Sequence, residues 1–147
     1  MIQRTVAIAA SAVLALIFGF VLVPAAPAKA GLVAQVDLSA QRMRVFVDGK
    51  KKYTWRVSTG KPGYKTKLGT FTPYNMVPFF YSKKWKMKLP HTVWVNGSTA
   101  IHGTYLTSHL GHVASHGCIR LSPAHAAKFY ALVKQNGLWF TTIHVVK

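Results

Sequence analysis

The sequence predicts a mainly β domain with one packed α-helix. Short runs of alternating apolar and polar residues indicate strands, the pair Asp48-Gly49 between two such runs indicates a hairpin, and residues 122–137 combine helical spacing with signals at both ends. Half of the 147 residues are hydrophobic and 12% are aromatic. A chain of this composition buries apolar side chains in a core and does not remain disordered.

The first part of the domain is expected to be an antiparallel sheet. Residues 35–38 and 42–47 should form its first two strands, the second with basic and apolar side chains in alternation. Asp48-Gly49 should then turn the chain into a third strand at residues 50–58, because this pair favours two-residue hairpin turns.

Residues 59–89 are rich in Gly, Pro, Lys and aromatic residues and are expected to form short strands and loops. This segment contains a mixture of aromatic and basic side chains: Tyr74, Phe79, Phe80, Tyr81 and Trp85 among Lys83, Lys84, Lys86 and Lys88. The mixture is open to two interpretations. The aromatic rings could form a platform on which nucleic-acid bases stack, or they could cap a small β core while the lysines face solvent. We expect the second arrangement, because the chain is expected to be exported.

Three further strands are expected in the rest of the chain. Residues 92–95 and 99–102 should pair around the turn residues Asn96-Gly97, and residues 138–146 should form the last strand. No internal repeat or low-complexity segment is visible, so all strands belong to one domain.

A single helix is expected before that last strand. Ser122 is suited to cap its N-terminus, Pro123 to occupy its first position, and Gly137 to end it. Its apolar face is predicted to consist of Ala126, Phe129, Tyr130 and Val133.

Residues 1–30 have the pattern of a secretory signal peptide. A basic Arg4 precedes an apolar stretch at residues 6–23, and Ala28 and Ala30 supply the small side chains that a signal peptidase requires. We expect cleavage after Ala30, which leaves residues 31–147 as one domain in the periplasm or cell wall. An uncleaved inner-membrane anchor is the alternative, since 18 apolar residues reach the lower limit for a membrane-spanning helix.

The charge balance restricts the chemistry. The chain has 19 Lys and Arg residues but only two acidic residues, Asp37 and Asp48, and it has no Glu. A paired-carboxylate glycosidase and a carboxylate-rich Mg²⁺ or Ca²⁺ site are therefore not expected. The net charge of +17 predicts an anionic partner, and export favours a polymer with carboxylates or phosphates over nucleic acid.

The single cysteine, Cys118, cannot form an internal disulfide, so it is a buried apolar filler, an intermolecular link or a working thiol. Its surroundings favour a working thiol. Gly117 permits a tight turn, and His116, Arg120 and a helix start nearby are expected to favour thiolate over thiol.

A cysteine nucleophile requires a base, and His102 at the end of an expected strand is the best candidate. The backbone of His116 is better suited to an oxyanion site, and structural or surface roles are expected for His91, His125 and His144. Because only two Asp residues are present and no motif links them to His102, the base is expected to be oriented by a backbone carbonyl.

These residues resemble a known family. His102-Gly103-Thr104, followed sixteen residues after the histidine by Cys118 in the sequence Ser-His-Gly-Cys-Ile-Arg-Leu, is similar to the signature of the L,D-transpeptidase catalytic domain (YkuD). The resemblance covers roughly residues 36–145. One departure is Lys67, where the family commonly has Pro. Further segments resemble the family's ordered landmarks: residues 37–39, 45–49, 57–60 and 68–71.

The resemblance implies a β-sandwich of mixed sheets with one packed helix, and a cysteine acyl-transferase that acts on peptidoglycan stem peptides. Cys118 would attack the carbonyl of the third stem residue and release the terminal D-Ala. The acceptor of the thioester would be a stem amine, a lysine of an outer-membrane or other protein, a D-amino acid or water. No cofactor, metal or nucleic acid is implied, and a monomer is expected.

The resemblance also implies a role for each residue of the site. His102 would accept the thiol proton, and the carbonyl of Gly103 would orient its imidazole. The loop of Ser115, His116 and Gly117 would hold the oxyanion, while Arg120 would fix this loop or bind a substrate carboxylate.

Two alternatives from other functional classes are open. His109, His112, His116 and Cys118 could bind zinc in a hydrolase, although Gly111 and Gly117 disfavour the helix that would align these ligands. The chain could instead be a non-catalytic cationic module that binds the cell wall, if its cysteine were buried and unreactive.

Overall fold

The computed structural model describes residues 31–147, and the expected signal peptide at residues 1–30 lies outside the described residues. This part of the chain contains two mixed β-sheets, the helix α1 (Pro123–Asn136) and the short 3-10 helices η1 (Thr107–His109) and η2 (Leu138–Phe140). The expected mainly β fold with one packed helix is confirmed. Over residues 31–147, no helix has the length and apolar character needed to cross a membrane.

The first sheet has five strands in the order β3-β2-β1-β9-β4. Its strands β1, β2 and β3 form an antiparallel meander, and β1 also pairs in parallel with β9 over its whole length. The strand bounds are Leu32–Asp37 for β1, Arg42–Val47 for β2, Lys50–Arg56 for β3, Gly69–Phe71 for β4 and Thr141–Val146 for β9.

The second sheet has four strands in the order β5-β6-β7-β8. Its first three strands are antiparallel, and β7 pairs with β8 in parallel. The strand bounds are Asn75–Ser82 for β5, Met87–Asn96 for β6, Thr99–Gly103 for β7 and Ile119–Leu121 for β8.

The expected hairpin between β2 and β3 is confirmed. Asp48 and Gly49 have φ angles of 49° and 75°. Two consecutive residues with positive φ match the right-handed twist of the strands on either side, and Asp and Gly tolerate that conformation.

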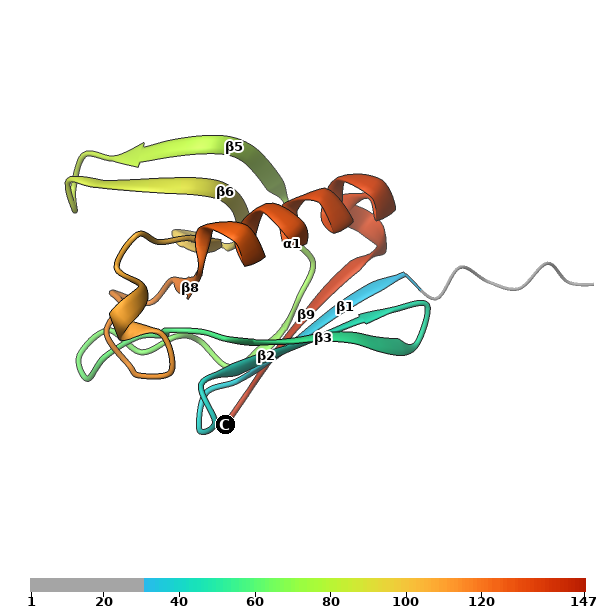
Figure 1. The fold of residues 1–147 in the computed structure, drawn as a ribbon, viewed down its shortest axis with the longest axis horizontal. Helices are drawn as coiled ribbons and strands as arrows, with labels where there is room; N and C mark the ends of the chain where they lie inside the picture. Colours follow the sequence, from blue (N-terminus) through green and yellow to red (C-terminus); the bar gives the residue numbers. More distant parts are fainter. Residues whose placement is uncertain (1–30) are drawn as a thin grey trace, which may run out of the picture.

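One core joins both sheets to the helix. Figure 1 shows α1 between the β5–β6 hairpin and the five-stranded sheet. Ser122 caps the helix by accepting a hydrogen bond from the backbone N–H of His125, and Phe129 on its buried face is 1% exposed. Alternate residues of β1, β2 and β9 complete the core from the first sheet: Leu32, Ala34, Val36, Met43, Val45, Ile143 and Val145.

Several strand boundaries differ from the prediction: β3 ends at Arg56, not at residue 58, β7 extends to Gly103, and the first and last strands differ most. The first strand covers Leu32–Asp37, not residues 35–38, and the last begins at Thr141 because residues 138–140 form η2. The pairing explains the difference in the last strand. Since the six residues of β1 pair one to one with Thr141–Val146, residues before Thr141 have no strand beside them.

The prediction for the aromatic segment was wrong in two respects. Residues 75–82 and 87–96 form a long hairpin, not a series of short strands, and its rings do not cap the core. Figure 1 shows the turn of this hairpin extending past the first turn of α1, so the helix leaves that end uncovered. The rings of the segment are between 36% and 56% exposed: Tyr74, Phe79, Phe80, Tyr81 and Trp85.

The shared core predicts a large effect of one helix residue on stability. Phe129→Ala should lower the free energy of unfolding by about 3–5 kcal/mol, because it leaves a cavity between both sheets and the helix. Urea unfolding measures this loss. Phe140→Ala is the matched control, since Phe140 is 60% exposed, and it should cost less than about 0.5 kcal/mol. Equal losses in the two variants would contradict a core centred on α1.

Candidate active site

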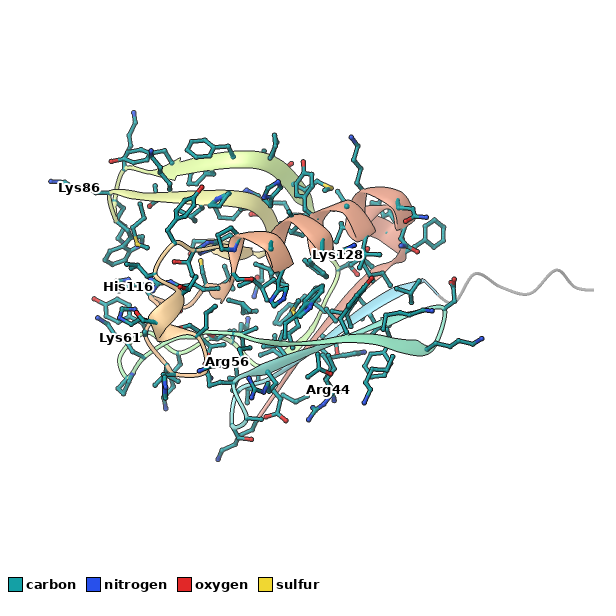
Figure 2. All side chains as sticks on the ribbon, in the orientation of Figure 1. Arg44, Arg56, Lys61, Lys86, His116 and Lys128 are labelled. Atoms are coloured by element: carbon teal, nitrogen blue, oxygen red, sulfur yellow. The ribbon has the colours of Figure 1, made fainter. Side chains whose placement is uncertain are left out.

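A cavity of about 330 Å³ lies beside the second sheet, and His102 and Cys118 both line it. Its walls come mainly from the β5–β6 hairpin, from the loop that contains Tyr64 and from the loop that contains His116. Figure 2 shows His116 and Lys61 at the end of the molecule where the hairpin turn with Lys86 is also found. The other lining residues are Tyr64, Phe80, Ser82, Lys84, Trp85, Met87, Leu89, Trp94, Ser98, Ser115 and Arg120.

Strand β7 positions His102, which is 3% exposed. Its Nδ1 lies 2.8 Å from the carbonyl oxygen of Gly103. Because a carbonyl can only accept a hydrogen bond, Nδ1 carries the proton and Nε2 has a free lone pair. The contact with a backbone carbonyl is the one expected from the scarcity of acids, since neither Asp37 nor Asp48 lines the cavity.

Burial makes His102 a neutral base. Desolvation lowers its pKa to about 4, although the hydrogen bond to Gly103 acts in the opposite direction, and the charge of Arg120 lowers it further. The imidazole is therefore unprotonated at neutral pH and able to accept a proton.

Gly103 allows this part of β7 to approach the helix. A Cβ atom at this position would lie 2.9 Å from Cγ of Pro90 and 3.2 Å from Cβ of Ala126. Any side chain would push β7 away from α1 and β6. The carbonyl that contacts His102 is thus fixed by close packing.

Cys118 lies immediately before β8, with Sγ 3.6 Å from the carbonyl oxygen of Ser98. Burial raises the pKa of the thiol, while a hydrogen bond from the backbone of Ala100 and the charge of Arg120 act in the opposite direction. The expectation that the surroundings favour thiolate was therefore wrong. Desolvation outweighs the nearby positive charge, and the three residues of β8 separate the sulfur from the helix cap at Ser122.

Ser115 closes the loop that carries Cys118. Its hydroxyl donates to the carbonyl of Cys118 at 2.6 Å and accepts from the N–H of Gly117 at 3.1 Å. Gly117 has a φ of 111°, which side chains strongly disfavour. The N–H of Gly117 was expected to help hold an oxyanion, but it donates to the hydroxyl of Ser115 instead. The N–H groups of His116 and Cys118 take no part in the two hydrogen bonds that Ser115 forms.

Sequence reasoning missed a second layer of polar residues behind this loop. The buried hydroxyl of Thr66 donates to the carbonyl of Gly117 and accepts from the N–H of Gly60, both at 2.9 Å. It joins two segments that are 51 residues apart. Only the three-dimensional arrangement reveals this role, because a lone threonine in a Gly- and Lys-rich stretch carries no local signal.

Gln41 holds the same region from the first sheet. Its side-chain amide donates to Oγ1 of Thr59 at 2.6 Å and accepts from the N–H of Thr59 at 3.0 Å. The carbonyl of Thr59 in turn accepts from the N–H groups of Ala114 and Ser115. A buried hydrogen-bond network thus connects the first sheet to the nucleophile loop.

Arg120 lies beside His102, its partner across the β7–β8 pair. Although its side chain lines the cavity, the residue is only 6% exposed. Its guanidinium donates a hydrogen bond to Sδ of Met87, at 3.9 Å. Within residues 31–147, the one salt bridge joins Arg44 to Asp37, so Arg120 has no carboxylate partner and its charge is available to a ligand.

The side chain of His116 forms part of the cavity wall. Its ring stacks on Trp85 with centroids 3.7 Å apart and planes at 9°, and it meets the edge of Tyr64 at 4.7 Å. This contact links the nucleophile loop to the β5–β6 hairpin. The exposed aromatic rings of the hairpin are therefore part of the site.

The zinc alternative was wrong. His109 and His112 are exposed, and His116 is stacked on Trp85. Throughout residues 31–147, no three His, Cys, Asp or Glu side chains lie close enough together to bind a metal ion.

The chain is similar to known families and structures. The YkuD family model, described as the L,D-transpeptidase catalytic domain, matches residues 32–145. An L,D-transpeptidase from Mycobacterium smegmatis is 28% identical with a TM-score of 0.72, covering 80% of this chain and 59% of that chain. An L,D-transpeptidase from Stackebrandtia nassauensis is 31% identical with a TM-score of 0.70, covering 82% and 57%. Comparison with curated proteins gives no match.

A third solved structure, an LD transpeptidase in complex with imipenem, is 24% identical with a TM-score of 0.72, covering 79% of this chain and 59% of that chain. The chain thus spans less than two thirds of the length of each of these structures. The family resemblance expected from the motif around Cys118 is confirmed.

The second polar layer predicts the effect of one substitution. Thr66→Val keeps the side-chain shape but leaves the carbonyl of Gly117 and the N–H of Gly60 without their partner. We expect the free energy of unfolding to fall by about 1–3 kcal/mol, measured by urea unfolding, and alkylation of Cys118 to change in rate. Thr72→Val, at an exposed threonine, is the control and should change neither quantity.

The pKa of His102 predicts how stability depends on pH. Because the folded value of about 4 lies below the usual 6.5 of an unfolded chain, the unfolded state binds more protons between these values. Stability should fall by about 3 kcal/mol as pH drops from about 6.5 to about 4. His102→Gln should remove this part of the dependence, and His109→Gln, at an exposed site, should not. A wild-type dependence unchanged in His102→Gln would contradict a buried neutral imidazole.

Proposed function

Because the chain belongs to the family of L,D-transpeptidase catalytic domains, we propose that it is exported and acts as a cysteine acyl-transferase on peptidoglycan stem peptides. One observation carries the proposal: a thiol and a neutral imidazole, the latter oriented by a backbone carbonyl, line the same cavity. The positive charge of the chain suits a polymer that carries many carboxylates.

In the first half-reaction, Nε2 of His102 accepts the proton of the Cys118 thiol as the sulfur attacks the carbonyl carbon at the L-centre of the third stem residue. The carbonyl becomes an oxyanion, which the N–H groups of His116 and Cys118 would stabilise. When the tetrahedral intermediate collapses, the bond to the terminal D-Ala breaks. The imidazolium returns its proton to the departing amine, leaving a thioester.

In the second half-reaction, an amine attacks the thioester and His102 accepts its proton. The sulfur leaves as the thiolate and is reprotonated by the imidazolium, so the enzyme returns to its starting state. A side-chain amine of another stem would give a 3→3 crosslink. A lysine of an outer-membrane or other protein would give protein attachment, a free D-amino acid would give exchange, and water would give trimming.

The neutral thiol and the neutral imidazole suit this sequence of steps. Burial raises the pKa of Cys118 and lowers that of His102, so the pair does not rest as an ion pair. Proton transfer accompanies the attack, as general base catalysis requires. Arg120, buried without a carboxylate partner, would bind a carboxylate of the substrate near the scissile bond.

The localisation forms part of the proposal. We propose that the signal peptide is cleaved after Ala30 and that residues 31–147 act as a monomer in the periplasm or cell wall. Neither a cofactor nor nucleic acid takes part in the proposed reaction.

The proposed roles predict the behaviour of three variants with purified tetrapeptide stem muropeptides. Mass spectrometry of the exported protein should show an acyl-enzyme on Cys118 and released D-Ala. Cys118→Ala should abolish the adduct. His102→Ala should slow single-turnover acylation by about 10²–10⁴-fold, the usual contribution of a general base.

The matched control replaces both carboxylates, Asp37→Asn with Asp48→Asn. It should leave acylation within a few-fold of the wild type, because neither side chain lines the cavity. A folded double variant as slow as His102→Ala would place an Asp in the catalytic relay. A wild-type protein that binds cell wall but never forms an adduct would favour a non-catalytic module.

A further inference from the structure

Two lysines outside the proposed catalytic machinery cover two rings of the cavity wall. Nζ of Lys61 lies 5.6 Å from the ring centroid of Tyr64, and Nζ of Lys84 lies 5.0 Å from that of Trp85. His116 lies between the two rings, stacked on one and in edge contact with the other. The two lysines therefore flank a single aromatic cluster.

This cluster is at the opening of the cavity. Tyr64 and Trp85 line the cavity and yet are 44% and 36% exposed. Arg120, by contrast, lies deeper, 6% exposed and beside His102. The positive charges are thus arranged at two levels, a buried guanidinium near the reacting atoms and two ammonium groups at the rim.

No acidic side chain neutralises the rim. Among residues 31–147 the side-chain carboxylates are those of Asp37, which pairs with Arg44, and of Asp48 in the β2–β3 turn. Desolvation is the main reason that the pKa of His116 is lowered, and the charges of Lys61, Arg120 and Lys84 lower it further. All three cations therefore act on the same ring. Two cations held beside aromatic faces and left without a counter-ion are suited to an anionic ligand.

We propose that Lys61 and Lys84 form a rim subsite that binds the free α-carboxylate of the second residue of the donor stem. This assignment rests on the proposed function. It adds a specificity determinant to that function, because a stem whose second residue carries an α-amide in place of the carboxylate would not be held there.

The chemistry of the stem identifies this carboxylate. The stem is attached to the glycan at its first residue, so this end must leave the cavity through the rim when the third residue is at Cys118. The second residue is D-Glu, joined to the third through its side-chain carboxyl, which leaves its α-carboxylate free. It is the free carboxylate nearest to the scissile bond on the side that leads out of the cavity.

Equilibrium binding tests the subsite without requiring turnover. Cys118→Ala in the exported protein is titrated by calorimetry with synthetic L-Ala-γ-D-Glu-diaminopimelate-D-Ala and with the same peptide amidated at the α-carboxyl of D-Glu. We expect the free acid to bind about three- to tenfold more tightly at low ionic strength, as two charge pairs at the protein surface would give. The difference should shrink at 0.5 M salt.

Substitution of both lysines, Lys61→Gln with Lys84→Gln, should remove the preference by weakening the free acid and leaving the amide unchanged. Lys128→Gln, at an exposed lysine of α1, is the control and should retain the preference. The proposal is overturned if the double variant still discriminates, if it weakens both peptides equally, or if the Cys118→Ala protein binds both peptides alike.

A separate assay distinguishes failure of the proposed function. If the Cys118→Ala protein shows the lysine-dependent preference but wild-type protein forms no acyl-enzyme with either peptide, the subsite stands and the acyl-transfer function fails. If wild-type protein is acylated equally fast by both peptides at concentrations well below saturation, the function stands and the subsite is wrong.

Discussion

The scarcity of negative charge determines how this site is built. The two acidic side chains are Asp37 at the end of β1, which pairs with Arg44, and Asp48 in the turn between β2 and β3. Neither can orient a histidine on β7, so the carbonyl of Gly103 takes that place. Within residues 31–147, the same scarcity leaves Arg120 and the rim lysines without a carboxylate partner. The shortage of acidic residues therefore explains why a neutral carbonyl orients His102. It also explains why the positive charges of Arg120 and the rim lysines are available to a ligand.

A carbonyl and a carboxylate differ in what they do for a base. Both fix the tautomer, but only a carboxylate brings a full negative charge to stabilise the imidazolium. With a carbonyl alone, desolvation prevails and the pKa of His102 falls to about 4. Desolvation shifts the pKa of the half-buried Cys118 thiol in the opposite direction, upward. Such a pair resists forming charges at rest, so its reactivity depends on a substrate carbonyl and oxyanion donors that accept the charge as it develops.

The sequence predicted those features that depend on neighbouring residues. The Asp48-Gly49 turn and the caps of α1 are local conformational preferences, and the nucleophile motif is one continuous segment. The network of Gln41, Thr59 and Thr66 was not predictable, because its members meet only after segments far apart in the sequence have folded together. The thiolate prediction failed for a related reason. Adjacent residues reveal nearby cations but not the depth of burial.

The β5–β6 hairpin shows why the cavity lies where the core ends. In a regular strand, residues two apart share a face, yet Met87, Leu89 and Trp94 of β6 all line the cavity while Val93 is in the core. The alternation changes around His91, whose φ of 53° lies in the left-handed region.

Before His91, the odd-numbered residues Met87 and Leu89 line the cavity. After it, the even-numbered residue Trp94 lines the cavity. Across the hairpin, Phe80 pairs with Leu89 and meets the ring of Trp94 edge to face. A strand with regular alternation would turn one of these two sets away from the cavity. With one left-handed residue, the same strand contributes Val93 and Val95 to the core and Met87, Leu89 and Trp94 to the wall of the cavity that holds the thiol.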